Sequence, residues 1–321
     1  MSTLSPSRLR LLGALALAAV FTPHLSSAQG ADPARFSAAT QTAQQAPSCK
    51  NLGSFYWEIG DATGVLASGA IGSSYGPNTS IKIASASKWV FGAYFLEKIG
   101  RNVQPTPQQV AELEMQSGHT SFNPFKCVFT GKVEGCFTAG SNSEVKPQDI
   151  GKFSYGGGHS QKLALEMGLG GLNSDALTRE VMGPLGITGL SYAHPQLAGG
   201  LEGPPSAYAQ FLRRIVSGQL RMKQFLGYAP VCTLPGVCPN ASYSPAKEAW
   251  HYSLDHWIED APGDDGAFSS PGAFGFYPWI AADKSTYGVL AREKLSSTAY
   301  LESAECGARI RRAWFTKQPV M

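Results

Sequence analysis

The segment Ser85-Ala86-Ser87-Lys88 places two hydroxyl groups and one amine within four residues. If this segment begins a helix, Ser85 and Lys88 share one face, because side chains three positions apart are neighbours on a helix. A serine nucleophile needs a neighbour that takes its proton, and a lysine amine in a partly desolvated site can do so. The largely apolar residues 89–96 favour such a site, so the pattern predicts a nucleophile at Ser85. The competing interpretation is a helix start that is capped by its serines.

The same Ser-x-x-Lys spacing occurs at two other places, Ser143–Lys146 and Ser244–Lys247. Both lie in polar sequence near proline, and neither is followed by a helical pattern that would aim the serine. Their context therefore favours Ser85 as the nucleophile.

A rival serine, Ser74, lies within residues 72–76, which fit the Gly-x-Ser-x-Gly nucleophile elbow of α/β-hydrolases. That motif requires a buried strand before it and a helix directly after it. Residues 77–80 read as a loop, so Ser74 is disfavoured. A Ser-His-Asp arrangement stays open, because no local signature selects one of the candidate histidines: His119, His159, His251 and His256.

The composition bounds the size of the fold and its partners. The chain has 321 residues, of which 43% are hydrophobic and 15% are charged. This is enough for one large domain or two interlocked lobes. The formal net charge is +3, and removal of residues 1–28, which hold two arginines and no acidic residue, leaves +3 − 2 = +1. A near-neutral chain gives no electrostatic reason to expect nucleic acid or an anionic membrane as partner.

The first 28 residues are typical of a secretory signal peptide. Two arginines precede the apolar stretch 11–21, and the small residues 26–28 predict cleavage after Ala28. No later segment holds about 18 uninterrupted apolar residues, so no membrane span is expected. Residues 29–48, rich in Ala, Gln and Thr, predict a linker or a frayed first helix. The mature protein is therefore expected to be secreted or periplasmic.

The cysteines are informative in an exported protein, because disulfides persist in oxidising compartments. Two close pairs flank short segments with turn residues and favour small disulfide loops: Cys127 with Cys136, and Cys232 with Cys238. The two that remain are Cys49 and Cys306. Sequence alone leaves other pairings open. Neither close pair has the spacing of a zinc site, so no metal is expected.

The order of the expected elements predicts a sheet built from both ends of the chain. Residues 53–72 read as a β-hairpin, and residues 106–234 alternate helices with glycine-rich loops. Strand-like segments and a closing helix follow at 250–260, 272–283, 285–293 and 298–315. We therefore expect an α/β (α+β) fold, an antiparallel sheet flanked by helices with a mostly helical inserted lobe. The expected α/β lobe is 49–105 plus 245–321, and the expected helical lobe is 106–244.

Five sequence blocks are informative together: residues 83–90, 113–122, 153–168, 181–192 and 197–218. In this order they resemble the serine β-lactamase and penicillin-binding-protein-like hydrolases, in the branch with class C β-lactamases, esterases and D-aminopeptidases. The resemblance runs from about Ser54 to the C-terminal helix. It implies that Ser85 is the nucleophile and Lys88 its proton acceptor. It also implies that Tyr155 is a phenolic group that shares the proton transfer.

Tyr155 belongs to a segment that resembles the Tyr-Ser-Asn motif of this family, with Gly157 where the family has asparagine. We expect Gly157 and His159 to lie at the substrate, with His159 or Gln161 in place of the missing asparagine. Residues 121–123 match an alternative Ser-x-Asn form, but they follow the nucleophile by only 121 − 85 = 36 residues. They are therefore a secondary candidate.

A later segment resembles the strand that carries Lys-Thr-Gly or His-x-Gly in the family, and reads Ser270-Pro271-Gly272 here. Ser270 and Gly272 are expected to contact the substrate, because a glycine lets backbone and substrate approach closely. The main-chain N–H groups of Ser85 and Ala273 are expected to form the oxyanion hole. The cation with which the family holds a substrate carboxylate is missing. Its loss disfavours β-lactams and D-Ala-D-Ala peptides.

These features predict an exported serine hydrolase that forms an acyl-enzyme with a small ester, amide or peptide. One alternative is a D-Ala-D-Ala carboxypeptidase or a β-lactamase. Another is a non-catalytic binding protein that kept the fold, because two of the three family motifs are altered. No metal or organic cofactor is implied. The sequence leaves the substrate and the oligomeric state open.

Overall fold

The structure is a computed structural model that describes residue 1, residues 26–27 and residues 32–321. The predicted signal peptide, residues 1–28, lies outside the described residues except at these few positions. Helix α1, Pro33–Gln45, replaces the linker or frayed segment that the sequence predicts at 29–48. Its start is fixed by Asp32, whose side chain accepts from the N–H of Ala34, and by proline at the first helical position.

Within the part of the chain that the structure describes, the main sheet has nine antiparallel strands. Its order is β1-β3-β2-β14-β13-β12-β11-β10-β8. The strands are β1 Ser26–Ser27, β2 Phe55–Asp61, β3 Val65–Ile71, β8 Val231–Cys232, β10 His251–Ser253, β11 His256–Glu259, β12 Ala267–Ser269, β13 Tyr277–Ile280 and β14 Thr286–Ala291. Strand β2 pairs with β14, with Tyr56 opposite Ala291. The prediction of a sheet built from both chain ends is confirmed.

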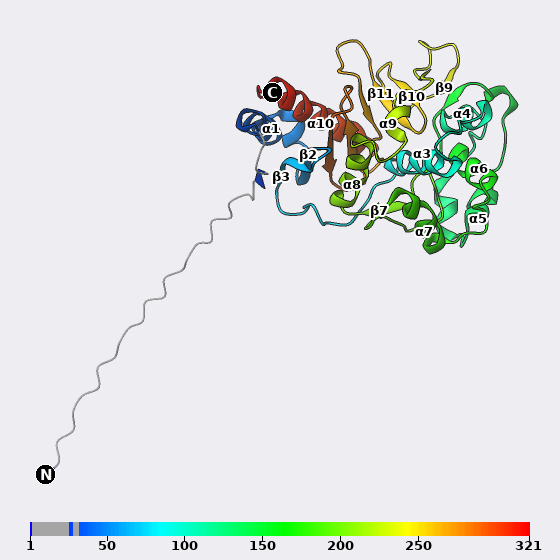
Figure 1. The fold of residues 1–321 in the computed structure, drawn as a ribbon, viewed down its shortest axis with the longest axis horizontal. Helices are drawn as coiled ribbons and strands as arrows, with labels where there is room; N and C mark the ends of the chain where they lie inside the picture. Colours follow the sequence, from blue (N-terminus) through cyan, green and yellow to red (C-terminus); the bar gives the residue numbers. More distant parts are fainter. Residues whose placement is uncertain (2–25, 28–31) are drawn as a thin grey trace.

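Helices cover both faces of this sheet. Alternation along β14 shows the two faces, because successive side chains of a strand point to opposite sides. Val289 packs in the core that contains α8, Pro205–Val216, whereas Leu290 packs in the core that contains α1 and α10, Ala299–Thr316. Figure 1 shows α1 beside α10 at one end of the molecule. Although its residues fall in the predicted helical lobe, α8 packs against the sheet.

A second group of helical segments lies at the opposite end of the molecule, where Figure 1 labels α4, α5, α6 and α7. They are α4 Pro107–Leu113, η1 Pro124–Phe129, α5 Val133–Thr138, η2 Pro147–Asp149, α6 Gly158–Glu166 and α7 Ser174–Leu185. Short strands tie them to the rest: β4 Ile81–Lys82, β7 Leu201–Gly203 and β6 Ser191–Tyr192 in one small sheet, and β5 Phe153–Ser154 with β9 Ala241–Tyr243 in another. Of the helices in the described residues, none has the length and apolar character needed to cross a membrane.

Helix α3, Ala86–Ile99, runs between these two regions and belongs to the largest hydrophobic core. Every residue from Ala86 to Leu96 is buried, including the lysine. A helix that is buried on all sides is a central packing element, so it holds its first turn rigidly. The candidate nucleophile lies at that first turn.

Three disulfides fasten the fold. They join Cys49 to Cys306, Cys127 to Cys136 and Cys232 to Cys238. The last two are the close pairs that the sequence favours, and the first joins the two cysteines that remain. Cys49 lies in α2, Pro47–Lys50, so the first of these disulfides links the N-terminal helices to α10.

Candidate active site

Ser85 lies at the N-terminal end of α3 and its hydroxyl is not used as a helix cap. The preceding residue, Ala84, has φ +45°, a left-handed conformation that non-glycine residues rarely adopt. This turn leaves Ser85 half-buried at the surface of a cavity. The second serine has the structural role: Ser87 donates to the carbonyl of Ala84 at 2.6 Å and accepts from the N–H of Leu201 at 3.2 Å. The capping interpretation therefore fails for Ser85.

Lys88 is 3% exposed and its ammonium group lies beside Ser85. Its Nζ atom donates to Ser85 Oγ at 3.2 Å and to the carbonyl oxygen of Ala198 at 3.1 Å. It also lies 4.6 Å from the centre of the Tyr155 ring, over the ring face. A neutral Lys88 in this position is within reach of the Ser85 proton.

Tyr155 follows β5 and is held by other aromatic rings. It stacks on Trp257 with ring centres 5.3 Å apart and meets the edge of Tyr252 at 5.9 Å. Its main-chain N–H donates to the carbonyl of Tyr243 at 3.0 Å. Among the described residues, no hydrogen bond joins the Tyr155 hydroxyl to Ser85 or Lys88. The ring face, and not the phenol oxygen, contacts the lysine in this structure.

The loop after β12 lies against the turn that precedes Ser85. Ser270 Oγ donates to the main-chain carbonyl of Ser85 at 3.1 Å. At Gly272 a Cβ atom would lie 2.1 Å from the carbonyl oxygen of Ile83, so only glycine permits this approach. Ser85 and Ala273 both line one cavity, and no hydrogen bond within residues 32–321 uses the main-chain N–H of either. The two N–H groups are therefore available to a ligand oxygen.

The cavity at Ser85 has a volume of about 280 Å³ and a mainly aromatic wall. Its aromatic residues are Tyr155, Tyr243, Trp250, Trp257 and Tyr300. Of the described residues that line it, none is a lysine, arginine, aspartate, glutamate or histidine. Pro271 lines the cavity, but Ser270 and Gly272 do not, because the hydroxyl and the Cα of these two residues face the Ser85 turn. The expected substrate contacts of Ser270 and Gly272 are thus replaced by a role in holding the loop.

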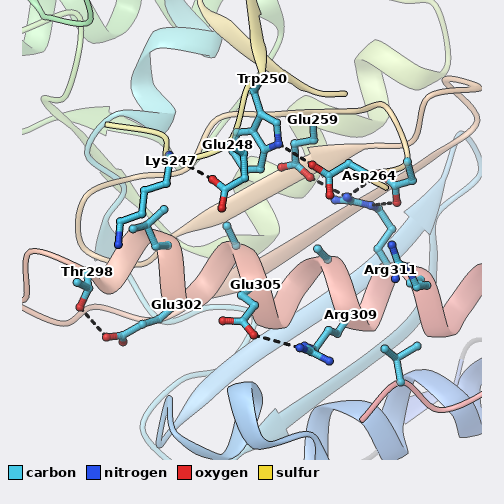
Figure 2. A pocket seen from close by; sticks show the side chains of 16 residues that line it. Lys247, Glu248, Trp250, Glu259, Asp264, Thr298, Glu302, Glu305, Arg309 and Arg311 are labelled. Carbon is cyan, nitrogen blue, oxygen red and sulfur yellow. Dashed lines mark hydrogen bonds and ion pairs between the residues drawn. The ribbon is translucent and has the colours of Figure 1, made fainter. Parts of the chain in front are cut away.

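A larger cavity, of about 660 Å³, adjoins the first along helix α10. Three residues line both cavities: Trp250, Leu301 and Ala304. Figure 2 shows Trp250 across from the helix and the side chain of Arg311 extending from the helix toward Glu259. Arg311 is 2% exposed and its guanidinium donates to Glu259 and to Asp265. The wall next to the aromatic cavity is therefore polar and charged.

Three residues of the second predicted motif are not at the cavity. Gly157 is buried, and a Cβ atom there would lie 2.6 Å from the Phe122 ring. His159 is fully buried, with Nε2 3.0 Å from the carbonyl of Ser154 and Nδ1 2.8 Å from Ser117 Oγ. Burial lowers the pKa of His159 to about 4. The buried amide of Gln161 bonds main-chain groups. The prediction that His159 or Gln161 replaces the family asparagine is wrong, because interior groups already use their polar atoms.

The rival residues do not form a second site. Ser74 is exposed and is followed by a turn instead of a helix. The side chain of Asn123, in the alternative Ser-x-Asn segment, caps η1 by accepting from the N–H of Phe125. No hydrogen bond in the described residues joins a histidine to Ser85. Over the same residues, no group of His, Cys, Asp and Glu is arranged to hold a metal ion.

Asp255, a buried acid close to α3, is not among the site residues that the sequence predicts. It lies in the two-residue turn between β10 and β11. A carboxylate in a short turn between aromatic strands is a weak sequence signal, because such turns are usually exposed. Only the packing of the turn against α3 makes this residue relevant to the site.

No protein-family model matches the chain, and no curated protein matches it. Solved structures do match, at low identity. A penicillin-binding-protein homologue from Caulobacter crescentus has a TM-score of 0.64 and 13% identity, over 89% of this chain and 99% of that one. EstCE1, described as a hydrolase with promiscuous acyltransferase activity, has a TM-score of 0.61 and 12% identity, over 88% and 98%. Simvastatin synthase (LovD) from Aspergillus terreus has a TM-score of 0.55 and 13% identity, over 86% and 99%.

At these identities the similarity concerns the fold. The chain has the fold shared by serine β-lactamases, penicillin-binding-protein homologues and related hydrolases and acyltransferases. The predicted fold class, an antiparallel sheet with flanking helices, is confirmed. The activity has to be argued from the site.

Proposed function

We propose that this protein is a serine hydrolase that forms an acyl-enzyme at Ser85. The observation that carries the proposal is the 3.2 Å contact between Lys88 Nζ and Ser85 Oγ at the edge of an open cavity. The unused N–H groups of Ser85 and Ala273 support it, because acyl transfer requires donors for the charge that develops on the carbonyl oxygen.

The reaction has two balanced halves. Ser85 Oγ attacks the substrate carbonyl carbon and its proton passes to neutral Lys88, which becomes an ammonium. The Ser85 and Ala273 N–H groups stabilise the oxyanion, the bond to the leaving group breaks, and the leaving group takes the proton from Lys88. A water molecule then attacks the acyl-enzyme, Lys88 again takes a proton, and it returns that proton to Ser85 Oγ as the acid product leaves.

Tyr155 contributes through its ring in this proposal. The ammonium that forms when Lys88 takes a proton lies over an aromatic face, and the ring quadrupole attracts a cation in this position. Proton transfer through the Tyr155 hydroxyl, which the family resemblance implies, requires that substrate binding reorient this group toward Ser85 or the leaving group.

The aromatic, uncharged cavity favours a neutral ester or amide with an apolar acyl group. A β-lactam or D-Ala-D-Ala peptide carries a carboxylate, and no cationic side chain from residues 32–321 lines this cavity. EstCE1, by its printed name a hydrolase with promiscuous acyltransferase activity, has this fold. We further propose that a larger leaving group extends past Trp250 into the polar cavity along α10. The three disulfides support an oxidising compartment, and thus export.

The test is intact mass spectrometry with 4-nitrophenyl butyrate and with benzylpenicillin. We expect turnover of the ester and a butyryl adduct on quenched wild-type protein, neither in Ser85→Ala, and at most slow acylation in Lys88→Met. Ser74→Ala is the matched control and should retain full activity. Equal reaction of Ser85→Ala would move the nucleophile elsewhere. A stable penicilloyl adduct would favour the carboxypeptidase or β-lactamase alternative, and no reaction with any acyl donor would favour a binding protein.

A further inference from the structure

The turn that holds Asp255 adopts a costly backbone conformation inside the protein. Leu254 and Asp255 have φ values of +35° and +66°. Two-residue hairpin turns of this kind prefer Asn and Gly at these positions. Both residues are fully buried, and the N–H of Asp255 donates to the carbonyl of Leu113 at 2.8 Å. The surrounding packing therefore holds Asp255 in an unfavourable backbone conformation and in a buried environment that disfavours its negative charge.

The turn packs on the face of α3 that carries Lys88. A Cβ atom at Gly92 would lie 3.0 Å from Asp255 Cβ and 3.0 Å from the carbonyl oxygen of Leu254. Gly92 follows Lys88 by four residues, which is one helical turn along the same face. The absence of a side chain at Gly92 thus allows the carboxyl group to approach the helix next to the lysine.

The carboxyl group of Asp255 lacks adequate hydrogen-bond partners. Among the residues that the structure describes, its Oδ2 atom has none, and Ser160 Oγ lies 3.5 Å from Oδ1, at the limit of a hydrogen bond. Burial raises the pKa of Asp255 well above its usual range, and the positive charge of Lys88 opposes this rise. The other titratable groups that act on Asp255 are the phenols of Tyr192 and Tyr252, whose pKa values burial raises, so both are neutral. Lys88 is therefore the charge to which Asp255 responds.

We propose that Asp255 is a positioning residue that acts through Lys88, by stabilising the ammonium that forms when Lys88 takes the Ser85 proton. This inference rests on the proposed function. The lysine head is buried, and its contacts with Ser85 Oγ, the Ala198 carbonyl and the Tyr155 ring carry no full negative charge. A buried ammonium without a counter-charge is strongly destabilised. The ionised form of Asp255, which the positive charge of Lys88 favours, supplies that charge without occupying the substrate cavity.

The first measurement is the pH profile of kcat/KM for 4-nitrophenyl butyrate in Asp255→Asn. Removal of the negative charge makes Lys88 easier to deprotonate, so the ascending limb should move to lower pH by about half a unit or more. A base weakened by about half a unit slows proton transfer by at most about threefold, so the plateau should fall by up to about threefold, with KM nearly unchanged. Glu58→Gln removes a buried acid from the main sheet and is the matched control, with the limb unmoved. If Asp255→Asn loses activity but the ascending limb of its kcat/KM profile stays at the wild-type pH, Asp255 has only a structural role and the inference is overturned.

The second measurement does not require catalysis. In Ser85→Ala protein with ¹³C-labelled lysine, the Lys88 signal, identified by its loss in Lys88→Met, reports the pKa of the amine directly. Asp255→Asn should lower this pKa, and Asp255→Gly, which suits the left-handed turn, gives the same readout if the Asn variant does not fold. A lowered Lys88 pKa, together with no hydrolysis by the wild-type protein, would support the electrostatic link and refute the proposed hydrolase. An unchanged pKa would refute the link alone.

Discussion

Gly272→Ala tests directly how the two main-chain donors are held together. A Cβ atom at this position would lie 2.1 Å from the carbonyl oxygen of Ile83. Non-bonded carbon and oxygen atoms stay about 3.3 Å apart, so the loop must move away from the start of α3 by about 1 Å. Because Ala273 follows the substituted residue directly, its N–H group moves away from that of Ser85.

The expected effect is on the chemical step. A misplacement of about 1 Å at a reacting centre can cost about 100-fold in rate, which corresponds to about 2.7 kcal/mol of activation free energy. We expect kcat for 4-nitrophenyl butyrate to fall by about this factor and KM to change by less than about threefold, because the donors act mainly on the transition state. Overpacking should also lower the free energy of unfolding by about 1–3 kcal/mol, so thermal unfolding is measured in parallel.

The matched control is Gly171→Ala. At position 171 a Cβ atom meets nothing within 4 Å, so this variant should keep wild-type kcat. The reasoning is refuted if Gly272→Ala is folded at the assay temperature and retains a third or more of the wild-type kcat. That result would mean that the N–H of Ala273 does not stabilise the oxyanion, or that the loop absorbs the added methyl group without moving it.

Three other perturbations test stability and substrate reach. Burial raises the pKa of Glu112 and Glu114 to about 8, above the unfolded value of 4.5, so the stability that the protonated carboxyls provide is full below pH 4.5 and lost as pH rises through 8. In thermal melts, Glu112→Gln and Glu114→Gln should be more stable than the wild type at pH 8, and their melting temperatures should depend less on pH. Melting temperatures that change with pH as steeply as those of the wild type would contradict this. Cys306→Ser opens a disulfide with Cys49 across a separation of 257 residues, and urea unfolding should show a loss of about 4–5 kcal/mol; a loss below about 1 kcal/mol would show that helix packing already fixes these ends. Trp250→Ala should raise KM about tenfold for esters with bulky alcohols and leave KM for small esters unchanged. Equal changes in KM for both kinds of ester would mean that the leaving group does not extend past Trp250 into the cavity along α10.

The parts of the fold that depend on local pattern are the parts that the sequence predicts well. The hairpin of β2 and β3 follows from two β-rich runs around residues 61–64, and the structure has it. The two close cysteine pairs are also local. The Ser85–Lys88 spacing predicts two side chains on one helix face, and the structure places them 3.2 Å apart. In each case the determining interactions span few residues.

The incorrect or missed features depend on partners that are distant in sequence. His159 reads as a polar residue near a motif, but its ring bonds Ser117 and Ser154 in the interior. Helix α1 reads as a linker or a frayed first helix because its hydrophobic residues are mostly alanines, and it packs beside α10. Asp255 becomes relevant only because Gly92 of α3 admits the turn. No local pattern carries such information.

The strand order has a consequence for the synthesis of this protein. Tyr56 in β2 is paired with Ala291 in β14, which follows it by 291 − 56 = 235 residues. Pairings between distant residues form slowly, because a long loop must close first. On the ribosome, the β2–β3 hairpin emerges early and keeps one strand edge unpaired until β14 has been made. An unpaired strand edge is a template for association with other chains. The nascent chain is therefore most prone to aggregation in the interval between these two strands, and slower translation of the central segment would lengthen that interval.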